Sequence, residues 1–296
     1  MRVAVRVPAT SANLGPGFDC FGLALDLCNE VTVDTEAEPG VSWEGEGADE
    51  LPTDGTDMVS RAVVATVEQQ ARHHPGAAIP SFAMHGVNRI PLERGLGSSS
   101  AAAVAGVAIA AVLLGPAGFD PADPGSAYTV YAYAAQLEGH PDNAAPAAYG
   151  GLTVIADGFV APMRAHPALR PVALIPEVRL KTALAREALP EQVALRDAVF
   201  NVAHGALVVH ALTQDPDLLP IALRDRLHQD VRLGLAPTVR EVFDDLTRRG
   251  IPVCVSGAGP SLLAFESNER PVGDPGEGWR VLPTSVRAAG LEALPT

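Results

Sequence analysis

The sequence predicts an α+β protein built from two parts. Short segments in which apolar and polar residues alternate, typical of half-buried strands, are interleaved with longer segments whose apolar residues recur at helical spacing. Many strand-like segments look paired in hairpins, which favours an α+β architecture over a doubly wound parallel sheet. The pattern changes around residues 157–169, and we therefore expect one part at residues 1–157 and a second at residues 158–296.

The first part is expected to begin with a strand at residues 2–7, which alternate in polarity. Residues 8–19 follow as a turn-rich loop with two glycines and two prolines, and residues 36–55 are acidic and glycine-rich, as expected of a surface excursion. Further strands are expected at residues 21–27, 30–35, 81–87 and 150–156. Helices are expected at residues 58–73, 101–115 and 128–138.

The second part is expected to hold one strand at residues 170–175, then a loop with the sequence KTALAREALP. Helices are expected near residues 193–213, 218–227 and 238–249. Strands are expected at residues 251–256 and 261–266, separated by the turn GAGP. Residues 267–278 are acidic, with two prolines and three glycines, and are expected to form a mobile loop.

Composition excludes several classes of protein. The 296 residues are 47% hydrophobic and 19% charged, which predicts a substantial core rather than disorder. A net charge of −14 argues against binding to nucleic acid or to anionic membranes. The three cysteines show no metal-ligand spacing, no signal-peptide pattern is visible, and the most apolar run, residues 101–114, is too short to span a bilayer. We therefore expect a cytoplasmic protein with reduced thiols.

The segment PLERGLGSSSAAA, residues 91–103, carries the most information about function. Gly95 and Gly97 bracket a tight turn, and three serines lead into the expected helix. A turn of small residues before a helix exposes unpaired N–H groups at the positive end of the helix dipole, which suits a phosphate group. The spacing matches neither a Walker A loop nor GxGxxG. An ordinary glycine turn capped by serine is the alternative.

Polar residues also gather in two other turns of the first part. Thr10, Ser11, Asn13 and Asp19 lie in the loop PATSANLGPGFD, where they could contact a ligand or simply cap the turn. The sequence EGHPDN, residues 138–143, places four polar or titratable groups at the broken end of a helix. A carboxylate there could hold Mg²⁺, and the histidine could donate to a substrate, act as a base or only end the helix.

Two segments of the second part complete the set. Thr182 and Arg186 lie in KTALAREALP, and Arg232 follows in DRLHQDVRLGLAP. Arginine matches carboxylate and phosphate groups, although in so acidic a chain these side chains could equally be solvated or salt-bridged. VSGAGPSLLAF, residues 255–265, contains a small-residue turn that could bring backbone N–H groups to a substrate or serve only as a hairpin.

The order of these motifs along the chain resembles that of the GHMP kinase superfamily (galactokinase, homoserine kinase, mevalonate kinase and phosphomevalonate kinase), and within it the homoserine kinase family. The match extends from residue 3 to about residue 266. The resemblance implies an N-terminal domain like the second domain of ribosomal protein S5, a ferredoxin-like C-terminal domain, and a site between them. It also implies phosphorylation of the L-homoserine hydroxyl by MgATP, a step toward threonine.

The resemblance further implies roles for individual residues. The nucleotide would be bound by the glycine–serine loop, namely Pro91, Arg94, Gly95, Leu96, Gly97, Ser98, Ser99 and Ser100. Mg²⁺ would be held by Ser99 and Glu138. The substrate would be contacted by Asn13, Asp19, His140, Asn143, Arg186 and Arg232, and catalysis would involve Asn143, Thr182 and Arg186, with Thr182 near the transferred phosphate. The expected binding partner is the small-molecule substrate, and the chain could also form a homodimer.

These roles are chemically reasonable for a zwitterion. Asp19 suits an ammonium group, while Arg186 and Arg232 suit a carboxylate, or one of them the γ-phosphate. Mevalonate kinases place an aspartate where Asn143 aligns, and an asparagine cannot take a proton. The hydroxyl proton would then pass to a phosphate oxygen or to solvent, with Asp142 as an alternative base. Two other functions compete with this one. The chain could be a related kinase that acts on another hydroxylated substrate, or a non-catalytic protein that only binds the ligand.

The sequence departs from the family at the adenine side. An Asn-Leu-Val sequence usually precedes the first helix of the family, and here the residues are Asp57, Met58 and Val59. We therefore assign no residue to the adenine base.

Overall fold

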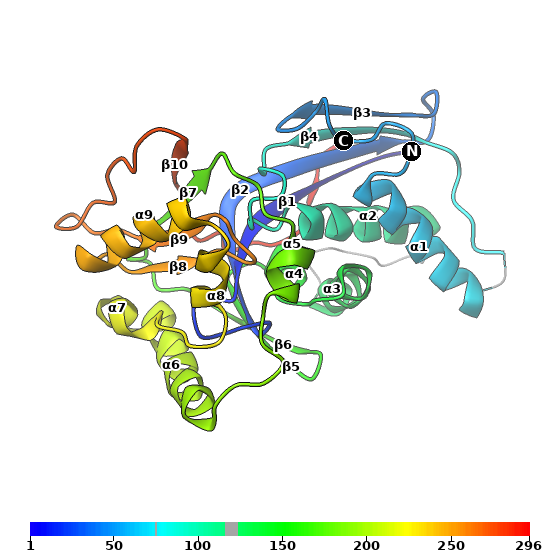
Figure 1. Ribbon diagram of the computed structural model, residues 1–296. Helices are drawn as coiled ribbons and strands as arrows, with labels where there is room; N and C mark the ends of the chain where they lie inside the picture. The colour runs from blue at the N-terminus through cyan, green and yellow to red at the C-terminus, as the bar shows by residue number, and fades with distance from the viewer. Residues whose placement is uncertain (75, 116–123) are drawn as a thin grey trace.

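The computed structural model describes residues 1–74, 76–115 and 124–296 and contains two antiparallel-rich sheets with helices against them (Figure 1). The first is a seven-stranded sheet with the order β11-β1-β2-β4-β3, in which β5 pairs with both β2 and β6. Its strands are β1 (Arg2–Ala12), β2 (Phe21–Asp34), β3 (Gly40–Gly45), β4 (Ala83–Asn88), β5 (Leu152–Ala156), β6 (Phe159–Met163) and β11 (Glu292–Leu294). The α+β class predicted from the sequence is confirmed.

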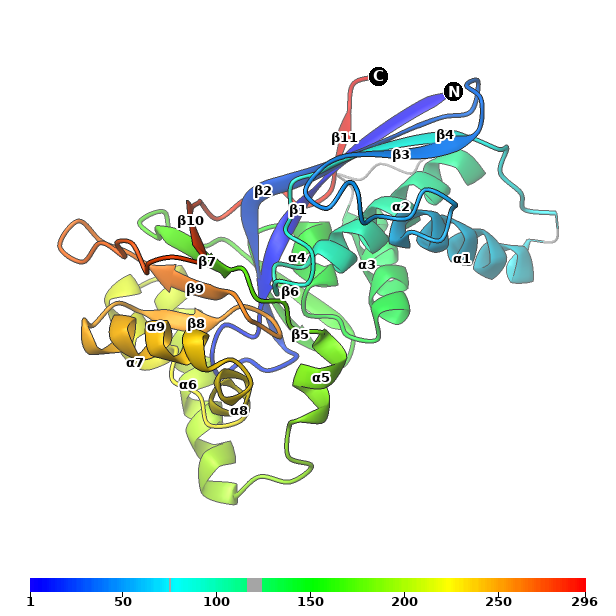
Figure 2. The same ribbon diagram turned by 45° about the horizontal axis from the view of Figure 1, so that its top comes forward.

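Four helices lie together below the first sheet in Figure 2, with α2 and α4 against the strands and α1 and α3 against α2. They are α1 (Met58–His73), α2 (Ser98–Leu114), α3 (Pro124–Glu138) and α4 (Ala144–Tyr149). The central helix α2 is rich in alanine and buried along most of its length, with β1 on one side and α1 and α3 on others. Small side chains allow this close packing, because a Cβ atom at Gly106 would lie 2.4 Å from the Val59 carbonyl oxygen of α1.

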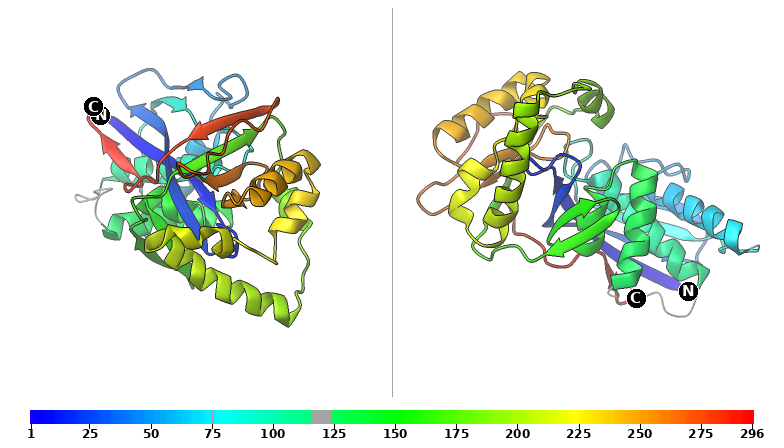
Figure 3. Two further views of the ribbon diagram at one scale, coloured as in Figure 1. Left: turned by 90° about the vertical axis from the view of Figure 1, so that its left-hand side faces the viewer. Right: turned by 90° about the horizontal axis from the view of Figure 1, so that it is seen from below.

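The second sheet has four antiparallel strands in the order β10-β7-β9-β8. They are β7 (Pro171–Pro176), β8 (Val253–Val255), β9 (Leu262–Phe265) and β10 (Trp279–Pro283). Helices α8 (Gln229–Gly234) and α9 (Pro237–Arg248) pack on one face, and α6 (Leu195–Thr213) and α7 (Leu219–Ala222) pack on the other, where the core continues into that of the first sheet (Figure 3). The short helix α5 (Thr182–Glu187) follows β7.

Two segments from beyond residue 157 join the first sheet. Strand β6 pairs with β5, and the C-terminal strand β11 pairs with β1, with Leu294 opposite Ala4. Both chain ends therefore lie at the same edge of the first sheet (Figures 1 and 3). The division at residues 157 and 158 stays a prediction.

Most expected elements are present, and the differences have physical causes. The helix at residues 58–73 is confirmed, with Asp57 accepting a hydrogen bond from the Ser60 N–H as its N-cap. The first strand continues past Pro8, because a register shift between Pro8 and Ala9 accommodates the proline. The strands expected at residues 21–27 and 30–35 form the single strand β2.

Three other expectations need correction. Residues 36–55 are not only a surface loop, because β3 lies within them and pairs in parallel with β4. KTALAREALP is not a loop throughout, because it contains α5. The helix expected at residues 218–227 is shorter, since α7 ends at Ala222 and the chain then turns around the carboxylate of Asp225. Among the described residues, no helix combines the length and apolar character needed to cross a membrane.

Candidate active site

The N-terminus of α2 forms a corner whose geometry suits an anion. Gly95 and Gly97 have φ angles of +72° and +70°, which favour glycine, and Gly97, as the N-cap, offers no side chain to accept from the first turn. A Cβ atom at Gly97 would lie 1.9 Å from the Thr10 Oγ1 atom. The glycine is therefore required both by backbone geometry and by space, and the N–H groups of residues 98–100 point out of the positive end of the helix.

Two other turns hold this corner in place. The Thr10 N–H donates to the Leu96 carbonyl oxygen at 3.0 Å, which joins β1 to the glycine–serine loop. The Ser256 hydroxyl donates to the Gly95 carbonyl oxygen at 2.7 Å and lies 2.9 Å from the Ser11 hydroxyl. The end of β1, the glycine–serine loop and the turn after β8 therefore meet at one place.

Asn13 is the connector between the first loop and the turn after β8. Its amide nitrogen donates to the Gly257 carbonyl oxygen at 2.9 Å, and its amide oxygen accepts from the Asp19 N–H at 2.9 Å. The residue is buried and has a φ of +70°, a conformation that asparagine tolerates better than most residues. Its side chain is thus already engaged within the protein at both ends.

A hydroxyl and a carboxylate meet beside the first turn of α2. The Ser99 hydroxyl donates to Glu138 Oε1 at 2.7 Å, and the Ser100 hydroxyl donates to Oε2 at 2.8 Å. No group of three or more His, Cys, Asp and Glu side chains that could hold a metal occurs in the described part of the chain. Mg²⁺ needs only one or two protein ligands when substrate phosphates and water supply the others, so this pair fits the ion.

The EGHPDN turn extends from Glu138 toward β1. The Asn143 Oδ1 atom accepts from the Thr10 hydroxyl at 2.8 Å, which places the amide beside Gly97. His140 Nδ1 lies 3.4 Å from Oδ1 of Asp142, whose side chain is buried. The Asp142 carboxylate raises the pKa of His140. The turn therefore presents an amide and an imidazole of raised pKa next to the N-terminus of α2.

Asp19 and Arg186 form a bidentate ion pair with two hydrogen bonds of 2.8 Å. This pair joins the first loop to α5, and the Asp19 carboxylate raises the pKa of Arg186. The guanidinium also lies 5.7 Å from the centre of the Phe18 ring. The two charges that the sequence assigns to opposite ends of a zwitterion neutralise each other here.

Arg232 is buried, with only 4% of its surface exposed, and it lacks such a carboxylate partner in its hydrogen bonds. One nitrogen donates to the Gly257 carbonyl oxygen at 2.7 Å and lies 3.1 Å from His228 Nδ1. Its Nε atom is buried with no hydrogen-bond partner among the residues described. Burial lowers the pKa of Arg232 to about 10, so the side chain is still a cation at neutral pH and is available to a ligand anion.

Three predicted site residues lie outside the contacts described above. Thr182 is exposed at the first position of α5. The Arg94 guanidinium donates to the carbonyl oxygens of Leu92, Pro176 and Glu177, so it ties the glycine–serine loop to the end of β7. Pro91 lines a cavity of about 300 Å³ beside that end of β7.

Sequence reasoning missed the residues that hold Arg232. Asp225 accepts from the N–H groups of His228 and Gln229 at 2.8 Å each, and Gln229 Oε1 accepts from the Val255 N–H at 2.8 Å. The sequence signal is the density of polar residues in DRLHQDVR, residues 225–232. The structure shows that several of these polar side chains are buried. Only the last arginine of this segment, Arg232, is among the predicted site residues.

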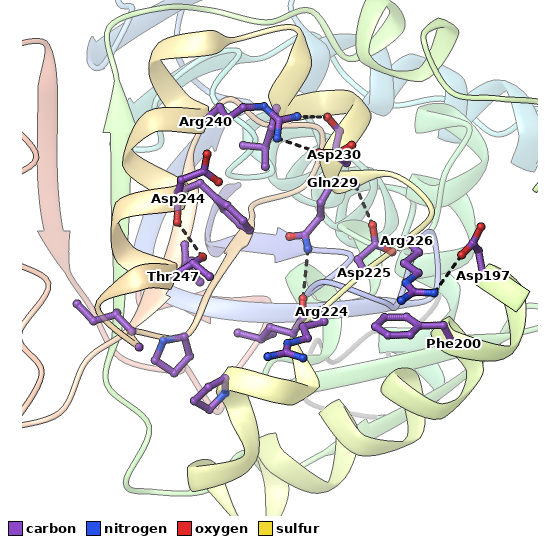
Figure 4. Close-up of a pocket in the computed structure, with 18 residues that line it drawn as sticks. Asp197, Phe200, Arg224, Asp225, Arg226, Gln229, Asp230, Arg240, Asp244 and Thr247 are labelled. Carbon is purple, nitrogen blue, oxygen red and sulfur yellow. Dashed lines mark hydrogen bonds and ion pairs between the residues drawn. The ribbon is translucent and has the colours of Figure 1, made fainter.

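A cavity of about 790 Å³ lies at the β8 edge of the second sheet, between the helices of its two faces (Figure 4). It is lined from α6, α7, α9 and β8, for example by Phe200, Pro220, Phe243 and Val253. Asp225 and Gln229 form part of its wall. None of the predicted site residues is among its lining, which is drawn from the described part of the chain.

Comparison with known proteins gives a consistent result. The family model "GHMP kinases N terminal domain" matches residues 58–151. A homoserine kinase from Clavibacter michiganensis subsp. michiganensis is 45% identical over 282 residues, covering 93% of this chain and 84% of the relative. One from Leifsonia xyli subsp. xyli is 44% identical over 285 residues, covering 93% and 82%. The crystal structure of homoserine kinase from Cytophaga hutchinsonii superposes with a TM-score of 0.82 at 26% identity, covering 99% of this chain and 97% of that one.

Proposed function

The chain belongs to the homoserine kinase family of the GHMP kinases, and from this premise we propose how its cleft performs the reaction. The activity is transfer of a phosphoryl group from ATP to the side-chain hydroxyl of L-homoserine, giving O-phospho-L-homoserine and ADP. The observation that carries the proposal for the site is the convergence of four turns around the N-terminus of α2, with Ser99 and Glu138 in contact there.

The glycine–serine loop is the nucleotide side of the cleft. Its backbone N–H groups at residues 97–100 would bind the phosphates, as the free N-terminus of α2 allows. Leu96 and Arg94 would act by fixing the shape of the loop rather than by touching ATP, because their polar contacts are with protein backbone. Ser99 and Glu138 would hold Mg²⁺, which neutralises charge on the phosphates when bound.

The first loop and the two arginines form the amino-acid side. Asp19 would take the ammonium group, and Arg232 would take the carboxylate, because it is a buried cation with an unpaired Nε. Arg186 must then leave Asp19. Its side chain is nearly half exposed, so once the substrate ammonium group replaces it at Asp19 it would join Arg232 at the carboxylate or contact the transferred phosphoryl group.

The hydroxyl of the substrate would lie near Asn143 and His140, next to the N-terminus of α2. Asn143 cannot accept a proton, and Asp142 is buried against His140. Phosphoryl transfer depends mainly on positioning and charge neutralisation, so we propose that the proton leaves late, to a phosphate oxygen or to solvent. Thr182, at the start of α5, would approach the transferred phosphate when Arg186 moves, since both belong to that helix.

A substrate panel tests the assignment. ADP release with MgATP is measured for homoserine, shikimate, mevalonate and galactose at matched concentrations. We expect homoserine to be turned over well above the others. A preference for another alcohol would favour a related kinase, and no ADP release with any of them, despite ATP binding, would favour a non-catalytic protein.

We also propose a homodimer and a cytoplasmic location. Helix α6 exposes Leu195, Val199 and Val202, which recur on one face at helical spacing. All three cysteines are free thiols, as expected in a reducing compartment. Light scattering of the purified protein would give the mass that decides between one copy and two.

A further inference from the structure

His228 lies between the first loop and the buried arginine and contacts both. Its Nε2 atom is 2.7 Å from the Gly15 carbonyl oxygen, and its Nδ1 atom is 3.1 Å from a terminal nitrogen of Arg232. A carbonyl oxygen only accepts and a guanidinium only donates. The proton of the neutral ring must therefore be on Nε2, and Nδ1 must accept from Arg232.

The environment keeps this ring neutral. The side chain is fully buried, and burial lowers the pKa of His228 to about 4. Arg232 disfavours a second positive charge at 3.1 Å, and the Asp225 carboxylate, 3.8 Å from Nε2, opposes this effect only in part. At neutral pH the imidazole acts as a fixed acceptor for the arginine.

The backbone of His228 is held by hydrogen bonds that involve neighbouring polar side chains. Asp225 accepts from its N–H, and Asn201 donates to Asp225 at 2.6 Å and to the Pro16 carbonyl oxygen at 3.3 Å. Gln229 connects the same turn to β8. Figure 4 shows Asp225 and Gln229 together on the wall of the 790 Å³ cavity, and Asn201 joins this support to the first loop through Pro16.

The loop that His228 contacts is also the loop that presents Asp19. Between Gly15 and Asp19 lies Phe18, whose ring is 5.4 Å from the His228 ring and 5.3 Å from the Arg232 guanidinium. One imidazole thus joins the backbone that carries the carboxylate to the side chain that carries the cation.

We propose that His228 is a positioning residue that sets the separation between Asp19 and Arg232, and so selects a short substrate that carries both an ammonium and a carboxylate group. This inference rests on the proposed function, because it concerns the same pair of charges. His228 does not touch the substrate. It acts through Arg232 and through the loop at residues 15–19.

Two substitutions at His228 test its hydrogen bond with Arg232. His228→Asn keeps an oxygen acceptor near the position of Nδ1, whereas His228→Leu fills the space without any acceptor. We expect His228→Leu to raise the homoserine KM roughly 10- to 100-fold, as the loss of a buried hydrogen-bond partner predicts, with the ATP KM changed less than about twofold. We expect His228→Asn to restore most of the homoserine KM.

Selectivity gives an independent readout. 4-Hydroxybutyrate lacks the ammonium group of homoserine, and 3-amino-1-propanol lacks the carboxylate. The ratio of kcat/KM for homoserine to that for each analogue is expected to fall about tenfold in His228→Leu, because the spacing of the two charges is no longer fixed. His210→Leu, at an exposed position near the end of α6, is the matched control and should leave both ratios unchanged.

The tautomer can be measured directly in the wild-type protein. Long-range proton–nitrogen NMR spectra of histidine-labelled protein are expected to show His228 protonated only on Nε2 between pH 5.5 and 8. A proton on Nδ1, an unchanged homoserine KM in His228→Leu, an equal rise in the ATP KM, or no rescue by asparagine would each overturn the proposal. If His228→Leu does not fold, the spectra and the asparagine variant still decide. Failure of the wild type to phosphorylate homoserine would refute the proposed function instead, and the tautomer result would stand separately.

Discussion

Gly97 offers the sharpest test of how the cleft is built. In Gly97→Ala the new Cβ atom would lie 1.9 Å from Thr10 Oγ1 and 3.1 Å from Asn143 Oδ1, at a φ of +70°. An alanine in that conformation costs about 1–2 kcal/mol, and the collision adds about 1–3 kcal/mol. We expect a total loss of about 2–5 kcal/mol in the free energy of unfolding.

The other end of the same helix provides a matched control. Gly115 has a φ of +60°, and no atom of the residues that the structure describes lies within 4 Å of the Cβ atom that an alanine would add. Gly115→Ala should therefore cost only the backbone strain, about 1–2 kcal/mol. Urea unfolding of both variants and of the wild type measures the two costs, and the difference between them isolates the collision at Thr10 and Asn143.

The phosphoryl-transfer rate should distinguish the same two variants. Because the collision displaces the Thr10–Asn143 contact beside the phosphate-binding corner, we expect kcat to fall at least about tenfold in Gly97→Ala and to stay near wild type in Gly115→Ala. Equal stability losses in the two variants would refute the close approach of β1, the EGHPDN turn and the glycine–serine loop.

Further predictions concern the ion, the substrate and pH. Glu138→Gln should lower kcat by about 100-fold and raise the Mg²⁺ concentration needed for half-maximal rate, and an unchanged kcat would remove Glu138 from that role. Arg232→Ala should raise the homoserine KM about 10- to 100-fold, whereas a rise in the ATP KM alone would assign Arg232 to the phosphate side. The pKa of His228 is lower in the folded protein than its ordinary value of 6.5, so the unfolded chain takes up the extra proton and stability falls as the pH drops from 6.5 toward about 4. That loss is about 3 kcal/mol over the full interval and is absent above it, and urea unfolding at pH 7 and pH 5 should show a steeper decline in the wild type than in His228→Asn.

The parts of the structure that the sequence predicted well have strong local signals. Helix α1 combines apolar residues at helical spacing with an aspartate cap, and α2 follows a glycine–serine turn. Strand β3 was missed because its residues are mostly exposed and its partner β4 is distant in sequence. Helices α4, α5 and α8 have six residues each, too few for a helical period to be visible.

The sequence predicted which turns form the site, but not which side chains within it contact each other. That small-residue corners would meet could be expected, because glycine allows close approach of backbones. The pairing of Asp19 with Arg186 could not, since 167 residues separate them and either charge suits a ligand equally well. The support of Arg232 by His228 depends on burial of both side chains, which only the folded chain determines.

The pairing of β11 with β1 makes the two chain ends neighbours on one sheet edge. A circular permutant that links residue 296 to residue 1 through a short linker and opens the chain in an exposed loop, such as residues 267–278, should keep the fold. Truncation before Glu292 would instead leave Ala4, Val5 and Arg6 of β1 without their neighbour and available to edge strands of other molecules. Affinity tags are therefore best attached through a spacer that leaves this final strand in register.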